Sequence, residues 1–147
     1  MLYFLYIKII LKGGEIMNLK VALATNDGEN FINNHFGEAD QYYIYTITNK
    51  SHQFIKSVAN NSIEEKQHAD PKKAKSIIKI LKKEGVQVVC NSAFGANIKR
   101  VKKKLVPVIT SKTTLEAGLE ELVANYEQLL QLWERGEERE YLNLKKN

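Results

Sequence analysis

A polar stretch at residues 26–40, NDGENFINNHFGEAD, separates two apolar runs. The run before it, LKVALAT at residues 19–25, and the run after it, QYYIYTIT at residues 41–48, are both typical of strands. A loop this polar cannot pack inside a domain, so we expect it at the rim of a sheet, where binding residues collect. It contains His35, followed by Phe36 and Gly37. Imidazole is a common metal ligand, and glycine lets the backbone approach a ligand closely.

The chain has 147 residues, enough for one domain with a core and too few for two ordinary domains. We expect a single domain over residues 17–134 and a charged, frayed tail over residues 135–147. The net charge is +5, but the lysines fall on expected helix faces without interleaved aromatic residues, which favours solvated helices over nucleic-acid binding. Cys90 is the only cysteine, so an intrachain disulfide is excluded and a cytoplasmic location is expected.

The first sixteen residues do not resemble a targeting segment. Their apolar run, MLYFLYIKIIL, is shorter than the roughly 20 residues of a membrane span and lacks the charge order and cleavage site of a signal peptide. Lys12-Gly13-Gly14-Glu15 can be encoded by a purine-rich bacterial ribosome-binding sequence just ahead of the Met17 codon. We therefore expect translation to start at Met17, residues 1–16 to lie outside the fold, and the protein to have no membrane partner.

The rest of the chain alternates between strand and helix patterns. Residues 52–58 form a plausible hairpin partner for residues 41–48, and Asp70-Pro71 begins a helix that ends at Gly85. A strand at residues 86–90, a helix at 94–104 and a strand at 105–110 follow. Pro107 favours an edge position for that last strand. A capping box at residues 113–116 begins a long helix that runs to about Gly136.

This order predicts three strands followed by a helix–strand–helix–strand–helix unit with a right-handed parallel crossover. Sheets of this kind bind ligands beyond the carboxyl ends of their parallel strands. Those ends are expected at Thr25, Cys90 and Thr110, so the following loops bring His35, the run at residues 91–95 and Ser111 to one rim.

Three segments together resemble the dinitrogenase iron–molybdenum cofactor biosynthesis family. They are the run KVALATNDG at residues 20–28, HFGEA at 35–39 and YIY at 43–45. The helix that ends at Gly85, the strand at 86–90 and the loop around Gly95 extend the resemblance to about residues 18–123. The loop after that strand, NSAFG, keeps only the last glycine of the glycine-rich loop that is usual in the family.

The resemblance implies an α/β fold of the ribonuclease H-like class, with a mixed five-stranded sheet in the order 3-2-1-4-5 flanked by α-helices. It also implies binding or delivery of an iron–molybdenum or other metal–sulfur cluster, rather than catalysis, with a cluster donor or acceptor protein as partner. The residues that the resemblance and the loop positions suggest for cofactor binding are Asn26, His35, Phe36, Gly37, Asn91, Ser92 and Gly95. Those suggested for metal ligation are His35, Cys90 and His68.

Each candidate also has a structural interpretation. His35 is either a metal ligand or a histidine that caps its own loop, and Cys90 is either a thiolate ligand or a small buried apolar residue. His68 precedes the first helix, from where it could reach the same rim. Gly95 lies near an expected helix start, where free N–H groups suit an anion, but it is equally consistent with a simple tight turn.

Two rival functions follow from the same pattern. A nuclease of the ribonuclease H-like class needs carboxylates on its first strand, and residues 19–25 have none, which argues against this activity. The second rival is a protein-interaction module that has the fold but binds no metal. We therefore expect a protein that is not an enzyme.

Overall fold

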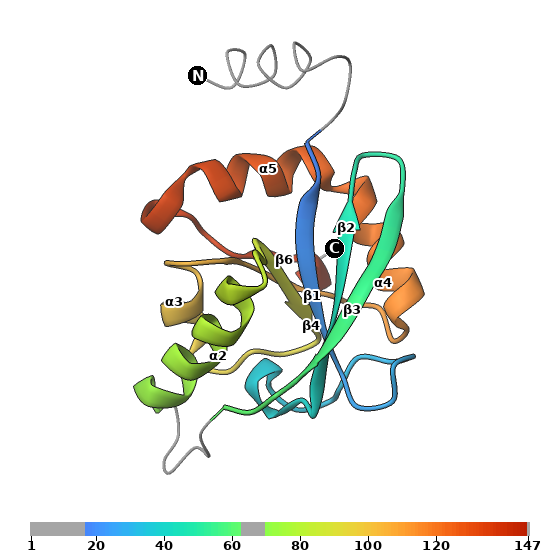
Figure 1. The fold of residues 1–147 in the computed structure, drawn as a ribbon. Helices are drawn as coiled ribbons and strands as arrows, with labels where there is room; N and C mark the ends of the chain where they lie inside the picture. Colours follow the sequence, from blue (N-terminus) through green and yellow to red (C-terminus); the bar gives the residue numbers. More distant parts are fainter. Residues whose placement is uncertain (1–16, 63–69, 147) are drawn as a thin grey trace.

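The computed structural model describes residues 17–62 and 70–146, which form a mixed α/β fold in which helices flank one six-stranded sheet (Figure 1). The strands are β1 (Leu19–Thr25), β2 (Gln41–Ile47), β3 (His52–Ala59), β4 (Val88–Asn91), β5 (Val106–Ile109) and β6 (Leu142–Asn143). The helices are α2 (Pro71–Lys83), α3 (Ile98–Val101), α4 (Leu115–Ala124) and α5 (Tyr126–Glu134), with 3₁₀ turns η1 (Phe36–Glu38), η2 (Gly136–Glu138) and η3 (Leu144–Lys146). The expected start at Met17 concerns residues 1–16, which lie outside the described part, as does His68.

The first three strands form an antiparallel meander. β1 pairs with β2 from Leu19 opposite Ile47 to Thr25 opposite Gln41, and β2 pairs with β3 with an irregularity between Ile44 and Tyr45. The loop of residues 26–40 therefore starts and ends at the same rim of the sheet.

The sheet order is β3-β2-β1-β4-β5-β6, so it has six strands where five were expected. β4 pairs in parallel with β1 and β5, and β5 pairs in parallel with β6. The expected edge position of the strand that contains Pro107 is thus wrong. The N–H group of Val106 donates to the carbonyl of Gln87, and that of Thr110 donates to the carbonyl of Asn91, so both point toward β4. Because successive residues of a strand alternate in direction, the nitrogen of Pro107 is directed away from β4. On that other side, β6 pairs only with Val108 and Ile109, and the proline interrupts no ladder bond.

The C-terminal segment does not fray as expected, because a buried arginine attaches it to the domain. Arg139 is almost fully buried and donates to three backbone carbonyls, those of Leu132 (3.0 Å), Lys102 (2.9 Å) and Trp133 (2.9 Å). Its guanidinium also lies over the Trp133 ring, 5.1 Å from the centroid. These contacts lead the chain into β6 at the edge of the sheet.

The helices differ from expectation mainly at their ends. α2 begins where Asp70-Pro71 predicts, with the Asp70 carboxylate accepting from the N–H of Lys72 at 3.0 Å. α3 is shorter than the helix expected over residues 94–104. It does not begin at Phe94, because Gly95 has a φ of +71° that no α-helix accommodates.

The long helix expected after residues 113–116 is two helices. Its N-cap is Thr114 rather than Thr113, since the Thr114 hydroxyl accepts from the N–H of Ala117 at 3.1 Å. Asn125 lies between α4 and α5, and its side-chain amide donates a hydrogen bond to the carbonyl of Glu121 at 2.8 Å.

The sheet divides the core into two layers. α4 and α5 cover one face, where they pack on Leu19, Val21 and Leu23 of β1, while α2, α3 and η1 cover the other, over Ala22 and Ala24. Successive side chains of β1 point to opposite faces of the sheet, so neighbouring residues belong to opposite layers. In the described part of the chain, no helix has the length and apolar character needed to cross a membrane.

Candidate functional site

Two loops meet beyond the ends of β1 and β4, and the buried side chain of Asn91 joins them. Its carbonyl oxygen accepts from the N–H of Ile32 at 3.3 Å, and its amide donates to Asn34 (2.9 Å) and Ala93 (3.0 Å). The hydroxyl of Ser92 adds a bond to the carbonyl of Ile32 at 2.7 Å. Both residues were expected to donate to a ligand, but here their polar groups hold the two loops together.

The turn at Phe36 is fixed from several sides. Its ring stacks on Phe94, with centroids 4.9 Å apart and planes at 12°, and its N–H donates to the carbonyl of Ala93 at 2.9 Å. The buried hydroxyl of Tyr42 donates to the Phe36 carbonyl at 2.9 Å. The amide of Asn60 donates to the Gly37 carbonyl at 2.9 Å. Phe36 and Gly37 therefore act as the rigid support of the site, since the ring is buried and the carbonyls are bonded.

His35 lies at the outer end of this support. It precedes η1 in an extended conformation, and its carbonyl accepts from the N–H of Glu38 at 2.8 Å. Its side chain is exposed, and its ring lies directly against Gly95 of the other loop. A Cβ atom on Gly95 would be 2.5 Å from Nδ1 of His35, so only glycine leaves room for the imidazole. This contact explains the glycine better than a helix start does, because α3 begins only at Ile98.

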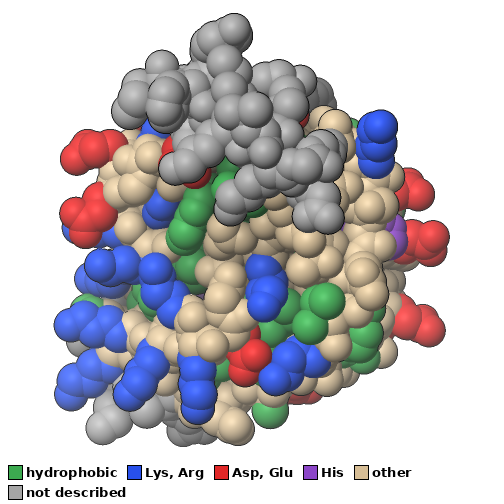
Figure 2. Space-filling view, turned by 45° about the horizontal axis from the view of Figure 1, so that its top comes forward, with side chains coloured by type: hydrophobic (Ala, Val, Ile, Leu, Met, Phe, Trp, Pro, Cys, Tyr) green, Lys and Arg blue, Asp and Glu red, His purple; other side chains and the backbone are tan. Residues whose placement is uncertain are grey.

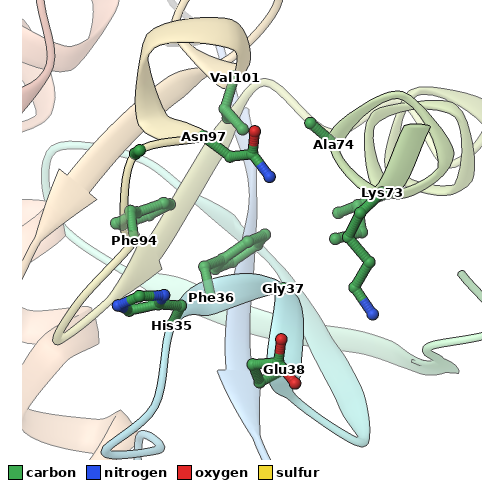
Figure 3. A pocket seen from close by; sticks show the side chains of 11 residues that line it. His35, Phe36, Gly37, Glu38, Lys73, Ala74, Phe94, Asn97 and Val101 are labelled. Atoms are coloured by element: carbon green, nitrogen blue, oxygen red, sulfur yellow. The ribbon is translucent and has the colours of Figure 1, made fainter. Parts of the chain in front are cut away.

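His35 stands between two hollows of different size. On one side is a pocket between η1, α2 and α3 whose interior offers about 30 Å³, and Figure 3 shows His35 at its rim beside Phe94. That volume holds one or two water molecules, so it cannot enclose a metal–sulfur cluster. On the other side is an open hollow of about 330 Å³, lined by Asn33, Asn34, His35 and Glu38. A larger ligand would therefore lie outside, against the exposed imidazole.

Cys90 is not brought to this site. It is fully buried in the layer under α4 and α5, whereas Phe36 and Phe94 belong to the opposite layer. Burial, together with the nearby Glu121 carboxylate, raises the pKa of the Cys90 thiol well above its usual value, which disfavours a thiolate ligand. Among residues 17–62 and 70–146, no three His, Cys, Asp or Glu side chains are grouped closely enough to hold a metal ion.

Asn26 and Asp27 form hydrogen bonds within the loop of residues 26–40 and do not line either hollow beside His35. The side-chain oxygen of Asn26 accepts from the N–H of Asp40 at 2.8 Å, which joins the two ends of the loop. The Asp27 carboxylate accepts from the side chain and N–H of Asn30 and from the N–H of Glu29, at 2.8–2.9 Å. These bonds, those from Asn30 foremost, hold the pKa of Asp27 well below its usual range.

One residue of the pocket escaped the sequence analysis. Lys73 lines the pocket with His35, although it was grouped with the solvated lysines of the first helix. The sequence does indicate this position, because Lys73, Ile77 and Leu81 follow one another at intervals of four residues, and Ile77 and Leu81 belong to the core. The helix period therefore places Lys73 on the buried face.

Comparisons with known proteins agree with this fold. The model of the family described as dinitrogenase iron-molybdenum cofactor matches residues 17–125, more than half of the chain. A solved structure from Methanocaldococcus jannaschii, provisionally described as a dinitrogenase, superposes with a TM-score of 0.50 at 19% identity, over 77% of this chain and 91% of that one. At that identity the likeness concerns the fold alone. No curated protein matches the chain.

Proposed function

Because the chain belongs to the dinitrogenase iron-molybdenum cofactor family, we propose that it binds an iron–molybdenum or related metal–sulfur cluster and delivers it to an acceptor protein. The family ties the chain to the biosynthesis or handling of this cofactor. In this proposal the protein is a cytoplasmic carrier and not an enzyme, and its sheet belongs to the ribonuclease H-like class.

The observation that carries the proposal is the placement of His35. The imidazole is exposed, it lies against Gly95, and the stacked Phe36 and Phe94 rings hold the loop that presents it. A rigid loop with an accessible imidazole supplies one preorganised metal ligand. The open hollow beside it leaves space for a cluster that remains largely outside the protein.

A single histidine ligand suits delivery rather than permanent storage. With one bond from the protein to the cluster, an acceptor has to replace only that bond to take the cargo. Cys90 has no part in this proposal, because its thiol is buried on the far side of the sheet.

The test uses the anaerobically purified protein, exposed to iron, molybdate and sulfide sources and then separated from unbound metal. Bound metal is measured by elemental analysis, and histidine ligation by the change in visible absorption and electron paramagnetic resonance. We expect His35→Ala to lose the bound cluster and remain folded by circular dichroism.

Two matched variants serve as controls. His52→Ala removes another exposed histidine, at the start of β3, and should keep the cluster. Cys90→Ala should also keep it, although with some loss of stability. If the wild-type protein retains no metal, or if His35→Ala retains as much as His52→Ala, the carrier proposal is wrong and the metal-free interaction module becomes the better interpretation.

A further inference from the structure

The outer edge of β3 exposes apolar side chains to solvent. β3 is the last strand in the sheet order, so within the described part of the chain no strand pairs with its outer side (Figure 1). Phe54 is 48% exposed and Ile55 is 43% exposed, although phenylalanine and isoleucine are usually buried. Among Lys, Arg, Asp and Glu, the strand contains only Lys56, which forms an ion pair with Glu84 at 3.1 Å. The edge therefore presents backbone N–H and C=O groups together with little charge that would repel another strand.

Phe54 is the outer member of a row of aromatic side chains. Its ring centroid is 5.4 Å from that of Tyr45, its partner on β2, and 5.2 Å from that of Tyr43. Both tyrosines pack against the core layer under α4 and α5, so the row lies on that face of the sheet. The faces of such rings attract cations, and most often the guanidinium group of arginine.

An open hollow of about 490 Å³ lies beside this row, between Tyr45, the loop of residues 26–40 and the start of α4. Glu29 and Glu116 line it, and no lysine or arginine does. Neither carboxylate forms an ion pair with another residue in the part of the chain that the structure describes. The hollow is therefore a locally negative surface on a chain whose net charge is +5, and it favours a cationic ligand.

The backbone around the hollow is fixed by hydrogen bonds. The N–H of Leu115 donates to the carbonyl of Glu29 at 2.8 Å, and the N–H of Phe31 donates to the carbonyl of Thr113 at 2.9 Å. These bonds tie the loop of residues 26–40 to the start of α4, which carries Glu116. Because the backbone is already ordered, little conformational entropy is lost there when a ligand binds.

We propose that an extended, arginine-bearing segment of a partner protein pairs with the free edge of β3. Its guanidinium group lies against the Phe54 ring, toward Tyr45 and the mouth of the hollow. The carboxylates of Glu29 and Glu116 offset its charge. An added strand lies about 4.8 Å from β3, and a long side chain on it reaches beyond the residue directly opposite. Backbone pairing supplies affinity, and the aromatic and acidic surface selects arginine.

Arginine fits this surface better than lysine does. The planar guanidinium group stacks on aromatic rings and offers paired N–H donors to carboxylates, whereas an ammonium group is a compact and strongly hydrated charge. The partner would also lie near the candidate cargo site, because the loop of residues 26–40 contributes Glu29 to this hollow and His35 to the other.

The test titrates the full-length protein with the labelled peptide Thr-Val-Thr-Arg-Thr-Val-Thr, in which the arginine and both valines share one face of an extended strand. Fluorescence anisotropy gives the affinity, and nuclear magnetic resonance shifts of the Gly28 and Phe54 amides locate the peptide. Replacing its arginine by citrulline, which is neutral and of similar shape, should weaken binding about tenfold, the combined effect of an exposed cation–π contact and surface ion pairs. Equal affinities for the two peptides, or no binding of the arginine peptide, would overturn the inference.

Matched variants separate this surface from general attraction between opposite charges. The double variant Glu29→Gln/Glu116→Gln should weaken binding of the arginine peptide about tenfold. Glu127→Gln/Glu134→Gln changes the net charge equally at exposed positions of α5 and should stay within about twofold of the wild-type affinity. Equal losses in the two double variants would show that the hollow has no specific part.

The role of the β3 edge is tested separately. Two further peptides carry N-methyl groups on alternate amides, at odd or at even positions. Because only alternate N–H groups of a strand point toward one neighbour, one of these peptides should lose binding and the other should keep it. Phe54→Ser, which changes an exposed side chain, should remain folded by circular dichroism and bind about tenfold more weakly. Equal binding of both methylated peptides would contradict strand pairing.

Sedimentation velocity tests the competing occupant, a second copy of this chain. We expect the protein without peptide to be a monomer. A dimer that Phe54→Ser dissociates would assign the edge to a second copy and overturn the inference. The inference does not rest on the proposed cargo, since His35→Ala should lose the cluster and bind the arginine peptide as the wild-type protein does.

Discussion

Gly95 and His35 show how a single atom can decide the geometry of the site. The glycine has a left-handed φ of +71°, and its missing Cβ is the space against which the imidazole rests. Gly136 has a similar φ of +64°, but a Cβ there would have no neighbour within 4 Å. Gly95 and Gly136 therefore both need a left-handed backbone, but only a Cβ at Gly95 would meet another side chain.

We predict that Gly95→Ala destabilises the protein by more than the roughly 1–2 kcal/mol of left-handed strain, and that it displaces His35 and weakens cluster retention. Gly136→Ala should show the strain alone and bind normally. Urea unfolding and metal analysis of both variants provide the check. If the two variants bind equally well, the contact with Gly95 does not position the imidazole.

Asp27 makes the stability of the long loop depend on pH. Its pKa in the folded protein lies well below the ordinary value of 3.8, because Asn30 and Glu29 donate to the ionised carboxylate. The stabilisation is thus complete above pH 3.8 and disappears as the pH falls toward the lower folded pKa.

We predict that Asp27→Asn destabilises the protein at neutral pH and that this difference shrinks below pH 3.8. Urea unfolding of both proteins on either side of that pH measures the change. A difference that stayed constant with pH would show that the carboxylate charge is not responsible.

At the scale of elements, the C-terminal segment depends on one side chain. Arg139 satisfies three carbonyls, from Leu132 and Trp133 at the end of α5 and from Lys102 after α3, and so leads the chain to β6. Its fork of N–H donors makes these bonds at once, which a lysine cannot reproduce.

We predict that Arg139→Met lowers the free energy of unfolding by about 3 kcal/mol and releases β6, since the carbonyls lose charged donors. Arg139→Lys should recover only part of this loss. Arg135→Met, at an exposed position nearby, should change stability by less than about 0.5 kcal/mol. Hydrogen exchange at Leu142 and Asn143 reports the release directly. Unchanged protection of these amides would contradict the anchoring role.

Local patterns predicted the elements whose own residues specify them. β1 has the expected bounds, and the Asp70-Pro71 start of α2 is where the capping pattern places it. β6 could not be predicted, because it is a two-residue strand whose position depends on bonds from Arg139 to distant carbonyls. The division at Asn125 was missed because apolar periodicity continues through it.

The candidate site follows the same rule. Strand order brought the loop with His35 to the loop with Gly95, as the pattern of parallel strand ends indicated. Cys90 was misleading because position along a strand says which rim is near but alternation decides which face a side chain occupies. The bonding of Asn91 and Ser92 within the loops depends on side-chain geometry that spacing alone does not contain.

At the scale of the whole molecule, basic side chains are concentrated on one flank of the face that Figure 2 shows. Lys and Arg side chains gather on the flank that carries α2 and α3, whereas Asp and Glu side chains lie on both flanks of the face that Figure 2 shows. The pocket that contains Lys73 opens between α2, α3 and η1, on the basic side. An anionic cargo would therefore meet a favourable field before it reaches His35.

We predict that anionic cargo associates more slowly as salt rises, because the Debye length falls from about 30 Å at 0.01 M to about 3 Å at 1 M ionic strength. The dissociation rate should change much less. Stopped-flow measurements with tetrathiomolybdate at several salt concentrations separate the two rates. An association rate independent of salt would show that the basic flank has no part in capture.

The chain enters β1 at the end of that strand opposite the loop of residues 26–40, as Figure 1 shows. The hydroxyl of Tyr126 donates to the carbonyl of Met17 and fixes the backbone there. A tag, a second domain or a chemical linker attached ahead of β1 would therefore leave the histidine facing solution. The protein could be immobilised on a surface through that end, as an oriented probe for the proteins that exchange cargo with it.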